Sequence, residues 1–360
     1  MEGAEWMKKI MFVCLALSNG GAERVVSILS DTLVKKGYTV YVLVLTDREQ
    51  VYEVHPQIQI LKPDKYAHGI KEKMLRIQTV RNAIKIHGID TVIAFSHYNT
   101  MYSVVAGAGL NVRIIGSERN DPAQIKDRRV LHWMRRQLYR KMDCLVCQTE
   151  DAKNYFPADI RKKSVVIMNP LNPEKLPQPY TGVRDKKIVC FARLEKQKNI
   201  PMALDAFAKL HKEFSDYSFE IYGDGQERDS IVEYIQSLQL DDCVSVYPFV
   251  DNIHEKVLKA SMFVLSSDYE GLSNSMLEAM AIGLPSVVTD CPCGGARMVI
   301  RDGVNGMLVP VGDANAMYLK MRELINHPQM AASISKEAVS IRETLNAQKI
   351  TEEWIRVIGE

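Results

Sequence analysis

The segment DYEGLSNSMLEAMAIGLP, residues 268–285, decides how this chain folds and where it binds a ligand. It follows the apolar run 262–265, which is typical of a buried strand, and its second half has the spacing of a helix over 275–282. Backbone N–H groups in the first turn of a helix lack partners within the helix, and the helix dipole favours negative charge there. We therefore expect a diphosphate to bind the residues just before and at this helix start: Gly271, Leu272, Ser273 and Asn274.

Two carboxylates of this segment, Glu270 and Glu278, flank the expected helix start. Glu278 is close enough to the helix start to accept hydrogen bonds from a ribose diol. Glu270 is close enough to accept one from a hexose hydroxyl. A second interpretation stays open, because Ser275 and Glu278 also match the S-x-x-E capping box, in which the glutamate only satisfies amides of its own helix.

Length and composition predict a globular protein of two domains, since the chain has 360 residues, 46% of them apolar and 25% charged. Residues 1–170 carry 26 Lys and Arg against 17 Asp and Glu, whereas residues 171–360 carry 20 against 27. Much of the basic excess falls in KDRRVLHWMRRQLYRK, residues 126–141, where basic and apolar residues interleave as in helices that lie on anionic membranes. An ordinary surface helix with a solvated charged face fits this stretch as well.

Strand-like and helix-like segments alternate along the chain, which favours a parallel α/β architecture. We expect two doubly wound, Rossmann-like domains that face each other across a cleft, with ligands beyond the carboxyl ends of their strands. The proline-rich stretch 169–182 is typical of a linker. The expected parts are a first domain over 1–170, a linker over 171–183, a second domain over 184–345, and a C-terminal helix over 346–360 that packs back toward the first domain.

Glycines follow two of the expected strands. Gly20 and Gly21 come after the first strand, and Gly223 and Gly225 flank Asp224 after a later one. Glycine lets the backbone approach a phosphate, a sugar or a nucleobase closely. Taken alone, Gly20 and Gly21 are better explained as a plain tight turn, whereas at Gly223 and Gly225 we expect a close approach to the nucleobase, with a simple turn as the alternative. Neither place has the complete G-x-G-x-x-G fingerprint of dinucleotide-binding proteins.

Cationic and histidine side chains also follow strands. Arg193 and Lys198 come after the strand expected over 187–192, where they could neutralise a diphosphate leaving group as its charge develops. Taken singly, each is better explained as a solvated surface charge. His97 follows the strand that ends at Ser96 and could reach the cleft, whereas the other histidines are expected on the surface or in loops.

The cysteines and the apolar runs indicate the cellular compartment. There are seven cysteines, an odd number, and four of them lie inside apolar runs, which suits reduced thiols of a cytosolic protein. No D-x-D triplet and no His, Asp or Glu cluster has metal-ligand spacing, so neither a metal nor a cofactor is expected. No apolar run approaches the roughly 18 residues of a membrane span. We expect a cytoplasmic protein whose membrane contact, if any, is peripheral and on the inner face.

Five motifs together, GGAER, ARLEKQKN, GDGQER, EGLSNSMLEAMAIGLP and CPCGGARMVIRDGVNGMLVP, resemble the family 4 retaining glycosyltransferases of GT-B fold. The resemblance covers nearly the whole chain and is most specific in its second half. It is strongest to bacterial members that build capsule, exopolysaccharide, O-antigen or lipid-linked oligosaccharide. It implies that Glu278 holds the ribose, that Glu270 contacts the donor sugar, and that Arg193 and Lys198 bind the diphosphate.

One position departs from the family pattern. Many relatives have a histidine after the fifth strand, in a pattern like SEHSN, whereas this chain has SERND with Arg119 in that place. A guanidinium does not accept a proton, so a catalytic histidine is not carried over. Arg119 could instead support a phosphate or an acceptor oxygen, and Glu118 and Asp121 could hold the acceptor or orient Arg119.

These inferences predict a retaining, metal-independent glycosyltransferase of bacterial surface polysaccharide synthesis. It is expected to move a hexose or N-acetylhexosamine from a UDP-linked or other nucleotide diphosphate sugar to a glycan or polyprenyl-diphosphate-linked acceptor. A non-catalytic sugar-nucleotide-binding subunit and a sugar-nucleotide epimerase of the same fold are the alternatives. No nucleic-acid partner is expected. The candidate residues are Arg193, Lys198 and Glu270 for catalysis; Gly20, Gly21, Gly223, Asp224, Gly225, Val250, Glu270, Gly271, Leu272, Ser273, Asn274 and Glu278 for the donor; and His97, Glu118, Arg119 and Asp121 for the acceptor.

Overall fold

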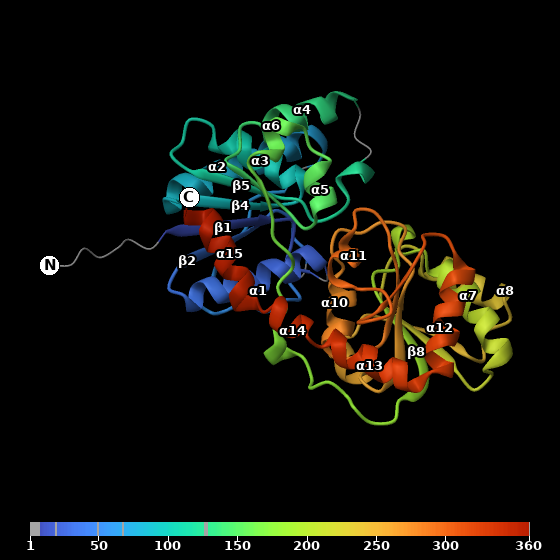
Figure 1. Cartoon of the computed structure of the whole chain (residues 1–360). Helices are drawn as coiled ribbons and strands as arrows, with labels where there is room; N and C mark the ends of the chain where they lie inside the picture. Colours follow the sequence, from blue (N-terminus) through green and yellow to red (C-terminus); the bar gives the residue numbers. More distant parts are fainter. Residues whose placement is uncertain (1–7, 19, 49, 67, 126–128, 360) are drawn as a thin grey trace. The chain divides into compact units, whose positions relative to one another are not determined.

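The computed structural model describes residues 8–18, 20–48, 50–66, 68–125 and 129–359. The chain folds into two compact units, one formed by Met1–Pro170 with Ala347–Glu360 and the other by Leu171–Asn346 (Figure 1). Each unit has one parallel sheet with helices packed on it, which confirms the two Rossmann-like folds expected from the sequence.

The sheet of the first unit has the strand order β3-β2-β1-β4-β5-β6-β7, and all its strands are parallel. The strands are β1 (Lys9–Cys14), β2 (Thr39–Val44), β3 (Gln59–Leu61), β4 (Thr91–Phe95), β5 (Arg113–Ser117), β6 (Cys144–Cys147) and β7 (Ser164–Val166). The helices are α1 (Gly21–Lys35), α2 (Gly69–His87), α3 (His97–Gly107), the short turn η1 (Pro122–Gln124), α4 (Arg129–Tyr139), α5 (Glu150–Asn154), α6 (Ala158–Arg161) and α15 (Ala347–Gly359).

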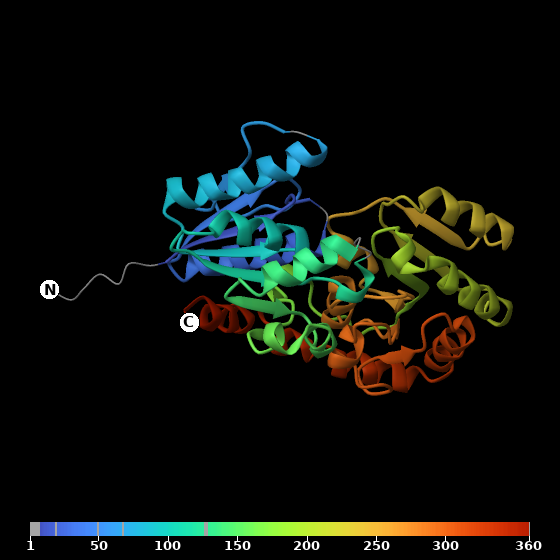
Figure 2. The same ribbon diagram turned by 90° about the horizontal axis from the view of Figure 1, so that it is seen from above.

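Helices cover both faces of this sheet. Figure 2 shows α2 on one side of it and α15 on the other. Because both faces are covered, β4 is buried at all its positions, and its sequence TVIAF is a continuous apolar run rather than an alternating one. The indole of Trp354 on α15 is fully buried and stacks on Phe95 at the end of β4, with ring centres 6.1 Å apart. The C-terminal helix therefore belongs to the core of the first unit.

The sheet of the second unit has the order β10-β9-β8-β11-β12-β13 and is also parallel throughout. The strands are β8 (Asp185–Phe191), β9 (Ser218–Tyr222), β10 (Val244–Tyr247), β11 (Ala260–Leu265), β12 (Ser286–Thr289) and β13 (Met307–Val309). The helices are η2 (Pro173–Lys175), η3 (Lys196–Lys198), α7 (Ile200–Glu213), α8 (Arg228–Ser237), α9 (Ile253–Val257), α10 (Asn274–Ala281), α11 (Gly295–Val299), α12 (Ala314–Asn326), α13 (Pro328–Ala338) and α14 (Ile341–Thr344).

The start of α7 is fixed by a capping residue and by packing in the core of the second unit. In α7 the side chain of Asn199 accepts a hydrogen bond from the Met202 amide at 3.4 Å, which caps the helix start, and Pro201 occupies the first turn. The apolar stripe of α7 includes Phe207, which packs on Phe219 of β9 with ring centres 5.5 Å apart. This packing fixes the segment between β8 and α7, where two of the candidate residues lie.

Strand order indicates where a ligand would bind in each unit. In both sheets the chain builds strands outward in one direction and then crosses to the other side, so the order reverses between β1 and β4 and again between β8 and β11. Ligands of doubly wound sheets bind at this reversal, beyond the carboxyl ends of the two central strands. The loops after β8 and β11 are therefore the first place to look for a site in the second unit.

Several local expectations differ from the structure. Helix α10 begins at Asn274, and β13 was not among the expected strands. The stretch expected as a linker, 171–183, lies within the second unit and contains η2. Among the described residues no helix is long and apolar enough to cross a membrane.

Candidate functional site

The loops after β8 and β11 bring Lys198 and Glu270 together. Lys198 ends the short turn η3 after β8, Glu270 follows β11, and the ammonium of Lys198 forms an ion pair with Oε1 of Glu270. Their side chains are 9% and 13% exposed, so the pair is largely shielded from water and its attraction is screened less than that of a surface pair. The two residues that the sequence assigned to the diphosphate and the donor sugar are thus direct neighbours.

Both oxygens of the Glu270 carboxylate have further partners. The Ser267 hydroxyl donates to Oε1 at 2.7 Å, and the Gln197 amide donates to Oε2 at 3.2 Å and to the carbonyl of Tyr269 at 2.8 Å. A carboxylate that accepts hydrogen bonds from several fixed donors is held in one orientation before a ligand arrives. Glu270 is therefore a preorganised acceptor.

The two loops are also tied to each other through the backbone. The Asp268 amide donates to the Gln197 carbonyl at 2.9 Å, and the side-chain amide of Asn199 donates to Asp268 Oδ1 at 2.7 Å. The Ser266 hydroxyl donates to the carbonyls of Lys198 and Asn199 at 3.0 and 2.8 Å. Asn199 can join the turn because it adopts the left-handed conformation at φ 43°, which asparagine tolerates better than most residues.

Glu278 lies buried on α10 and contacts a histidine. Its Oε2 is 2.8 Å from Nε2 of His254 on α9, and the residues are 4% and 5% exposed. The ring of Phe191, the last residue of β8, meets the His254 ring edge-on with centres 6.1 Å apart. His254 was expected on the surface or in a loop; this expectation is wrong, because Phe191 and Glu278 bury it.

The capping-box interpretation does not fit the start of α10. Its N-cap residue is Ser273, whose side chain makes no capping hydrogen bond, and Ser275 is already the second residue of the helix. Gly271 and Leu272 precede the cap, and Asn274 is the first helical residue. Gly271 also packs closely on α11, because a Cβ added to Gly295 would lie 1.9 Å from the Gly271 carbonyl oxygen.

Arg193 lies two residues beyond the end of β8, at the same edge of the sheet as Lys198. Its side chain is exposed, and among the described residues it takes part in no ion pair. The structure thus joins Lys198 to Glu270 and Glu278 to His254, and it leaves Arg193 with its charge in solvent.

The glycines after β9 are required by the protein's own backbone. A Cβ on Gly223 would lie 1.9 Å from the carbonyl oxygen of Ala192, and one on Gly225 would lie 2.1 Å from that of Leu194. Asp224 between them accepts a hydrogen bond from the Phe249 amide at 3.0 Å, and Val250 beside it is half-buried. These contacts pack the loop after β9 against the loop that carries Arg193.

The glycines of the first unit lie at the start of α1, beyond the end of β1. Gly20 is the N-cap and Gly21 is the first helical residue. A Cβ on Gly20 would meet only the end of the flexible Glu23 side chain. Backbone packing therefore does not require a glycine at position 20, whereas it does require one at positions 223 and 225.

Three acceptor candidates of the first unit have partners within the protein. Glu118 is buried and accepts a hydrogen bond from the Tyr139 hydroxyl. Asp121 caps η1, since its Oδ1 accepts from the Ala123 amide at 2.9 Å. His97 is the first residue of α3 and packs against the ring of Tyr98 with centres 4.1 Å apart.

The guanidinium of Arg119 lies over two aromatic rings. Its guanidinium carbon lies 4.4 Å from the ring centre of Phe95 and 5.5 Å from that of Trp354, and its Nη1 donates to Asn169 Oδ1 at 2.9 Å. Neither Glu118 nor Asp121 orients it, contrary to one expectation from the sequence, because the aromatic rings and Asn169 hold the guanidinium instead. Burial lowers the pKa of Arg119 to about 9, so it stays cationic at neutral pH.

Comparisons with known proteins agree with this arrangement. A sequence model described as "Glycosyltransferase Family 4" matches residues 19–175, and one described as "Glycosyl transferases group 1" matches residues 173–340. The chain belongs to the family 4 glycosyltransferases. Two of its relatives are bacterial glycosyltransferases that match it over almost their whole length, and solved structures share its GT-B fold.

The chain is 25% identical over 361 residues to a Campylobacter jejuni protein, GalNAc-alpha-(1->4)-GalNAc-alpha-(1->3)-diNAcBac-PP-undecaprenol alpha-1,4-N-acetyl-D-galactosaminyltransferase, covering 98% of this chain and 99% of the relative. It is 22% identical over 366 residues to the amylovoran biosynthesis glycosyltransferase AmsD of Erwinia amylovora, covering 98% and 100%. The structure of Anabaena HepE in complex with UDP and glucose matches with a TM-score of 0.83 at 17% identity, covering 98% of this chain and 100% of HepE.

Three residues that contact the candidate site residues were not predicted from the sequence of this glycosyltransferase. Gln197 and Ser267 bind Glu270, and His254 binds Glu278. Gln197 and Ser267 stand next to residues already singled out, in the loops after β8 and β11, so the rule that sites follow strands could have found them. His254 had no such signal, since its burial depends on residues distant in sequence.

Proposed function

We propose that this glycosyltransferase moves a hexose or N-acetylhexosamine from a UDP-linked donor to a lipid-linked glycan, with retention at the anomeric carbon and without a metal. The observation that carries the proposal is the Lys198–Glu270 pair, fixed by Ser267 and Gln197 at the strand-order reversal of the second sheet. Further support comes from the family match and from the UDP bound in the HepE structure.

In this proposal Glu270 accepts a hydrogen bond from a hydroxyl of the donor sugar. Its carboxylate already has the orientation that such a bond needs, because three donors hold it. Glu278 accepts from the ribose hydroxyls, and His254 keeps its carboxylate in place. A preorganised acceptor loses little entropy when the ligand binds, which favours affinity.

Lys198 has two roles in the proposed reaction. An ammonium has three N–H donors, so Lys198 can hold Glu270 with one and contact a diphosphate oxygen with another. Arg193, whose charge is exposed, and the residues from Gly271 to Asn274 at the start of α10 would complete the diphosphate site. Positive charge at these positions stabilises the diphosphate as it leaves.

The proposed reaction is a displacement on one face of the sugar. The bond between the anomeric carbon and the diphosphate oxygen breaks with its electron pair passing to the diphosphate, and the acceptor oxygen bonds to the same face of that carbon. The acceptor's proton passes to the departing diphosphate, so no protein group needs to act as a base. The products are the glycosylated acceptor and UDP.

The proposed acceptor is a saccharide on a polyprenyl diphosphate, and synthesis of a bacterial surface polysaccharide would be its context. The name of the Campylobacter relative includes a PP-undecaprenol acceptor, and that of AmsD refers to amylovoran biosynthesis. Helix α4 supports contact with a membrane, because Val130, Trp133 and Met134 are exposed on it beside basic residues. Lys126, Asp127 and Arg128, which belong to the same basic stretch, lie outside the described residues.

A panel of nucleotide sugars tests the proposal. UDP-linked sugars are expected to raise the melting temperature of the protein in the presence of EDTA, and GDP- and TDP-linked sugars to raise it less. With the best donor and a polyprenyl-diphosphate saccharide, NMR of the product should show the anomeric configuration of the donor. Conversion of the donor sugar without an acceptor would favour an epimerase, and binding without any product would favour a non-catalytic subunit.

A further inference from the structure

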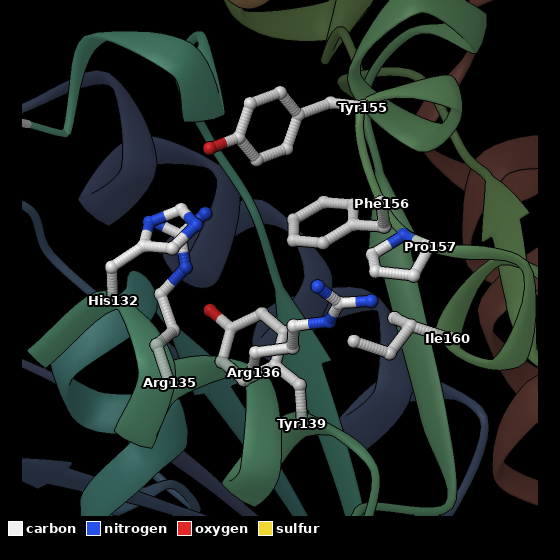
Figure 3. A pocket seen from close by; sticks show the side chains of 8 residues that line it. All are labelled: His132, Arg135, Arg136, Tyr139, Tyr155, Phe156, Pro157 and Ile160. Carbon is white, nitrogen blue, oxygen red and sulfur yellow. The ribbon is translucent and has the colours of Figure 1, made fainter. Parts of the chain in front are cut away.

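A pocket of about 250 Å³ lies in the first unit, and none of the described residues that line it was assigned above to the donor. It is lined by His132, Arg135, Arg136, Tyr139, Tyr155, Phe156, Pro157 and Ile160. In Figure 3 the side chains of Arg135, Arg136 and Tyr139 extend from α4 toward Tyr155 and Phe156 on the facing segment. The helical residues have the spacing i, i+3, i+4, i+7, which places them on one face of α4.

Arg135 is the central feature of this pocket. It is 2% exposed, and its guanidinium carbon lies 5.7 Å from the ring centres of Tyr139 and Phe156 and 5.8 Å from that of Tyr155. Three aromatic rings at these distances attract the cation and hold it in place. The face of a ring does not replace a hydrogen-bond acceptor, so these contacts leave the N–H groups of the guanidinium to other partners.

Arg135 forms no ion pair within the part of the chain that the structure describes. Its Nη1 is buried without a hydrogen-bond partner there. Asp159 is paired with Arg140, and Glu118 accepts a hydrogen bond from the Tyr139 hydroxyl rather than from Arg135. A buried cation without a partner is costly, and proteins keep such groups where an anion meets them.

The remaining lining residues favour a phosphate as that anion. Arg136 adds a second guanidinium, His132 an imidazole and Tyr155 a hydroxyl donor, and no Asp or Glu is among the described residues that line the pocket. Guanidinium groups bind phosphate oxygens through paired, charge-assisted hydrogen bonds. We propose that this pocket binds a phosphate group, carried either by a soluble phosphate or diphosphate compound or by the headgroup of an anionic lipid.

This pocket is distinct from the exposed apolar residues of the same helix. Val130, Trp133 and Met134 follow the spacing i, i+3, i+4 along a different face of α4 from the pocket residues. From the sequence alone, all basic residues of 126–141 were expected on one surface of the helix, facing solvent or a membrane. The structure instead turns Arg135 inward, so the pocket does not depend on the proposed membrane contact.

Calorimetric titration with inorganic pyrophosphate tests the proposal on the full chain at low ionic strength. UDP is present at saturation, so that any donor site in the second unit is already filled. The wild-type protein is expected to bind one pyrophosphate, and Arg135→Met is expected to weaken binding about tenfold or more. The matched control is Arg129→Met, which removes the same charge from an exposed position of α4 and should change the dissociation constant less than about twofold.

A second variant and a second measurement show whether lost binding in Arg135→Met comes from misfolding. Arg136→Met alters an exposed side chain, so the fold should survive, and it should weaken pyrophosphate binding more than Arg129→Met does. In phosphate-free buffer Arg135→Met should unfold at the wild-type temperature or above, since it removes a buried cation that has no partner. Added pyrophosphate should then raise the melting temperature of the wild type but not of this variant.

Vesicles distinguish the two sources of the phosphate. If the ligand is a lipid headgroup, vesicles of phosphatidylglycerol should bind the wild type and Arg129→Met more tightly than Arg135→Met, and phosphatidylcholine vesicles should not show this difference. If it is soluble, only the pyrophosphate titration should depend on Arg135. The proposal is overturned if neither probe depends on Arg135, or if Arg129→Met and Arg135→Met lose binding equally. If the protein does not bind UDP, the proposed function fails but the pyrophosphate result still holds, because the pocket lies in the first unit and the proposed donor site in the second.

Discussion

The imidazole of His254 lies 2.8 Å from the carboxylate of Glu278, and both residues are buried. Replacement of His254 by phenylalanine removes a hydrogen-bond partner from a buried carboxylate, so we expect the free energy of unfolding to fall by about 1 to 3 kcal/mol. Urea titration measures this loss, and His327→Phe, at an exposed position of the same unit, is the control. If Glu278 holds the ribose, His254→Phe should also weaken UDP binding; unchanged UDP affinity in a folded variant would remove His254 from the donor site.

Lys198→Met should lower kcat by about a hundredfold or more, because it removes one preorganised charge from the proposed diphosphate site. Steady-state kinetics with the best donor measures this effect. Lys196→Met is a matched control, since Lys196 begins the same short turn η3 but is exposed. Equal kinetics of the two variants would contradict the role of Lys198.

The Lys198–Glu270 contact also predicts coupling between the two residues. Each single variant, Lys198→Met or Glu270→Gln, leaves a largely buried group without its partner, whereas the double variant leaves neither. The free energies of unfolding should therefore be non-additive by about 0.5 to 3 kcal/mol in a double-mutant cycle. Strict additivity would mean that the ion pair does not contribute to the fold.

Gly225→Ala should destabilise the protein by about 1 to 3 kcal/mol, because the new Cβ is forced into a packed site. The added carbon would lie 2.1 Å from the backbone carbonyl oxygen of Leu194, which cannot rotate away as a side chain can. Gly359→Ala is the control, since its Cβ would meet nothing within 4 Å. Thermal unfolding of both variants checks this, and a neutral Gly225→Ala would mean that the loop shifts at little cost.

Burial makes two thiols unreactive. It raises the pKa of Cys190 to about 12 and, together with the charge of Glu270, that of Cys291 to about 12. Both therefore stay protonated at pH 8, and a thiol is far less nucleophilic than a thiolate. Labelling of the native protein should begin at the half-buried Cys243, so that Cys243→Ser removes the fastest phase. Rapid labelling of Cys190 before unfolding would contradict this.

The exposed apolar residues of α4 give the membrane proposal its test. Trp133 is 61% exposed, and Trp133→Ser should weaken binding to anionic vesicles about tenfold, as expected from the loss of a large buried apolar side chain. Val183→Ser, at an exposed position of the second unit, is the control. Vesicle sedimentation at low salt measures both, and equal binding of the two variants would argue against contact through α4.

The sequence was sufficient for features that depend on local patterns. Apolar runs placed β8 and β11, and parallel alternation with helices put Lys198 and Glu270 beyond their carboxyl ends, where strand order then brought them together. The short strand β13 was missed because Met307–Val309 is only three residues long and follows a glycine. A run of that length has no measurable periodicity.

Features that depend on residues distant in the chain could not be predicted. In its local sequence IHEKV, His254 is indistinguishable from a surface histidine, and only Phe191 and α10 bury it. Arg119 was expected to meet an acceptor, yet Trp354 near the end of the chain stacks on its guanidinium. Arg135 is one of several basic residues in the stretch 126–141. Only its contacts with the rings of Tyr155 and Phe156 show that it is buried while its neighbours are exposed.

The position of α15 has a consequence for how the protein is made. Trp354 fills the core beside Phe95, and the carbonyls of Val357 and Ile358 accept hydrogen bonds from Arg113 and Lys8 at 3.1 and 2.9 Å. The ribosome synthesises the first sheet before the second unit and this helix after it. The first unit must therefore wait, with an apolar face uncovered, until the whole second unit has been translated, and a message truncated before the codon for Ala347 would yield a first unit that lacks part of its own interior.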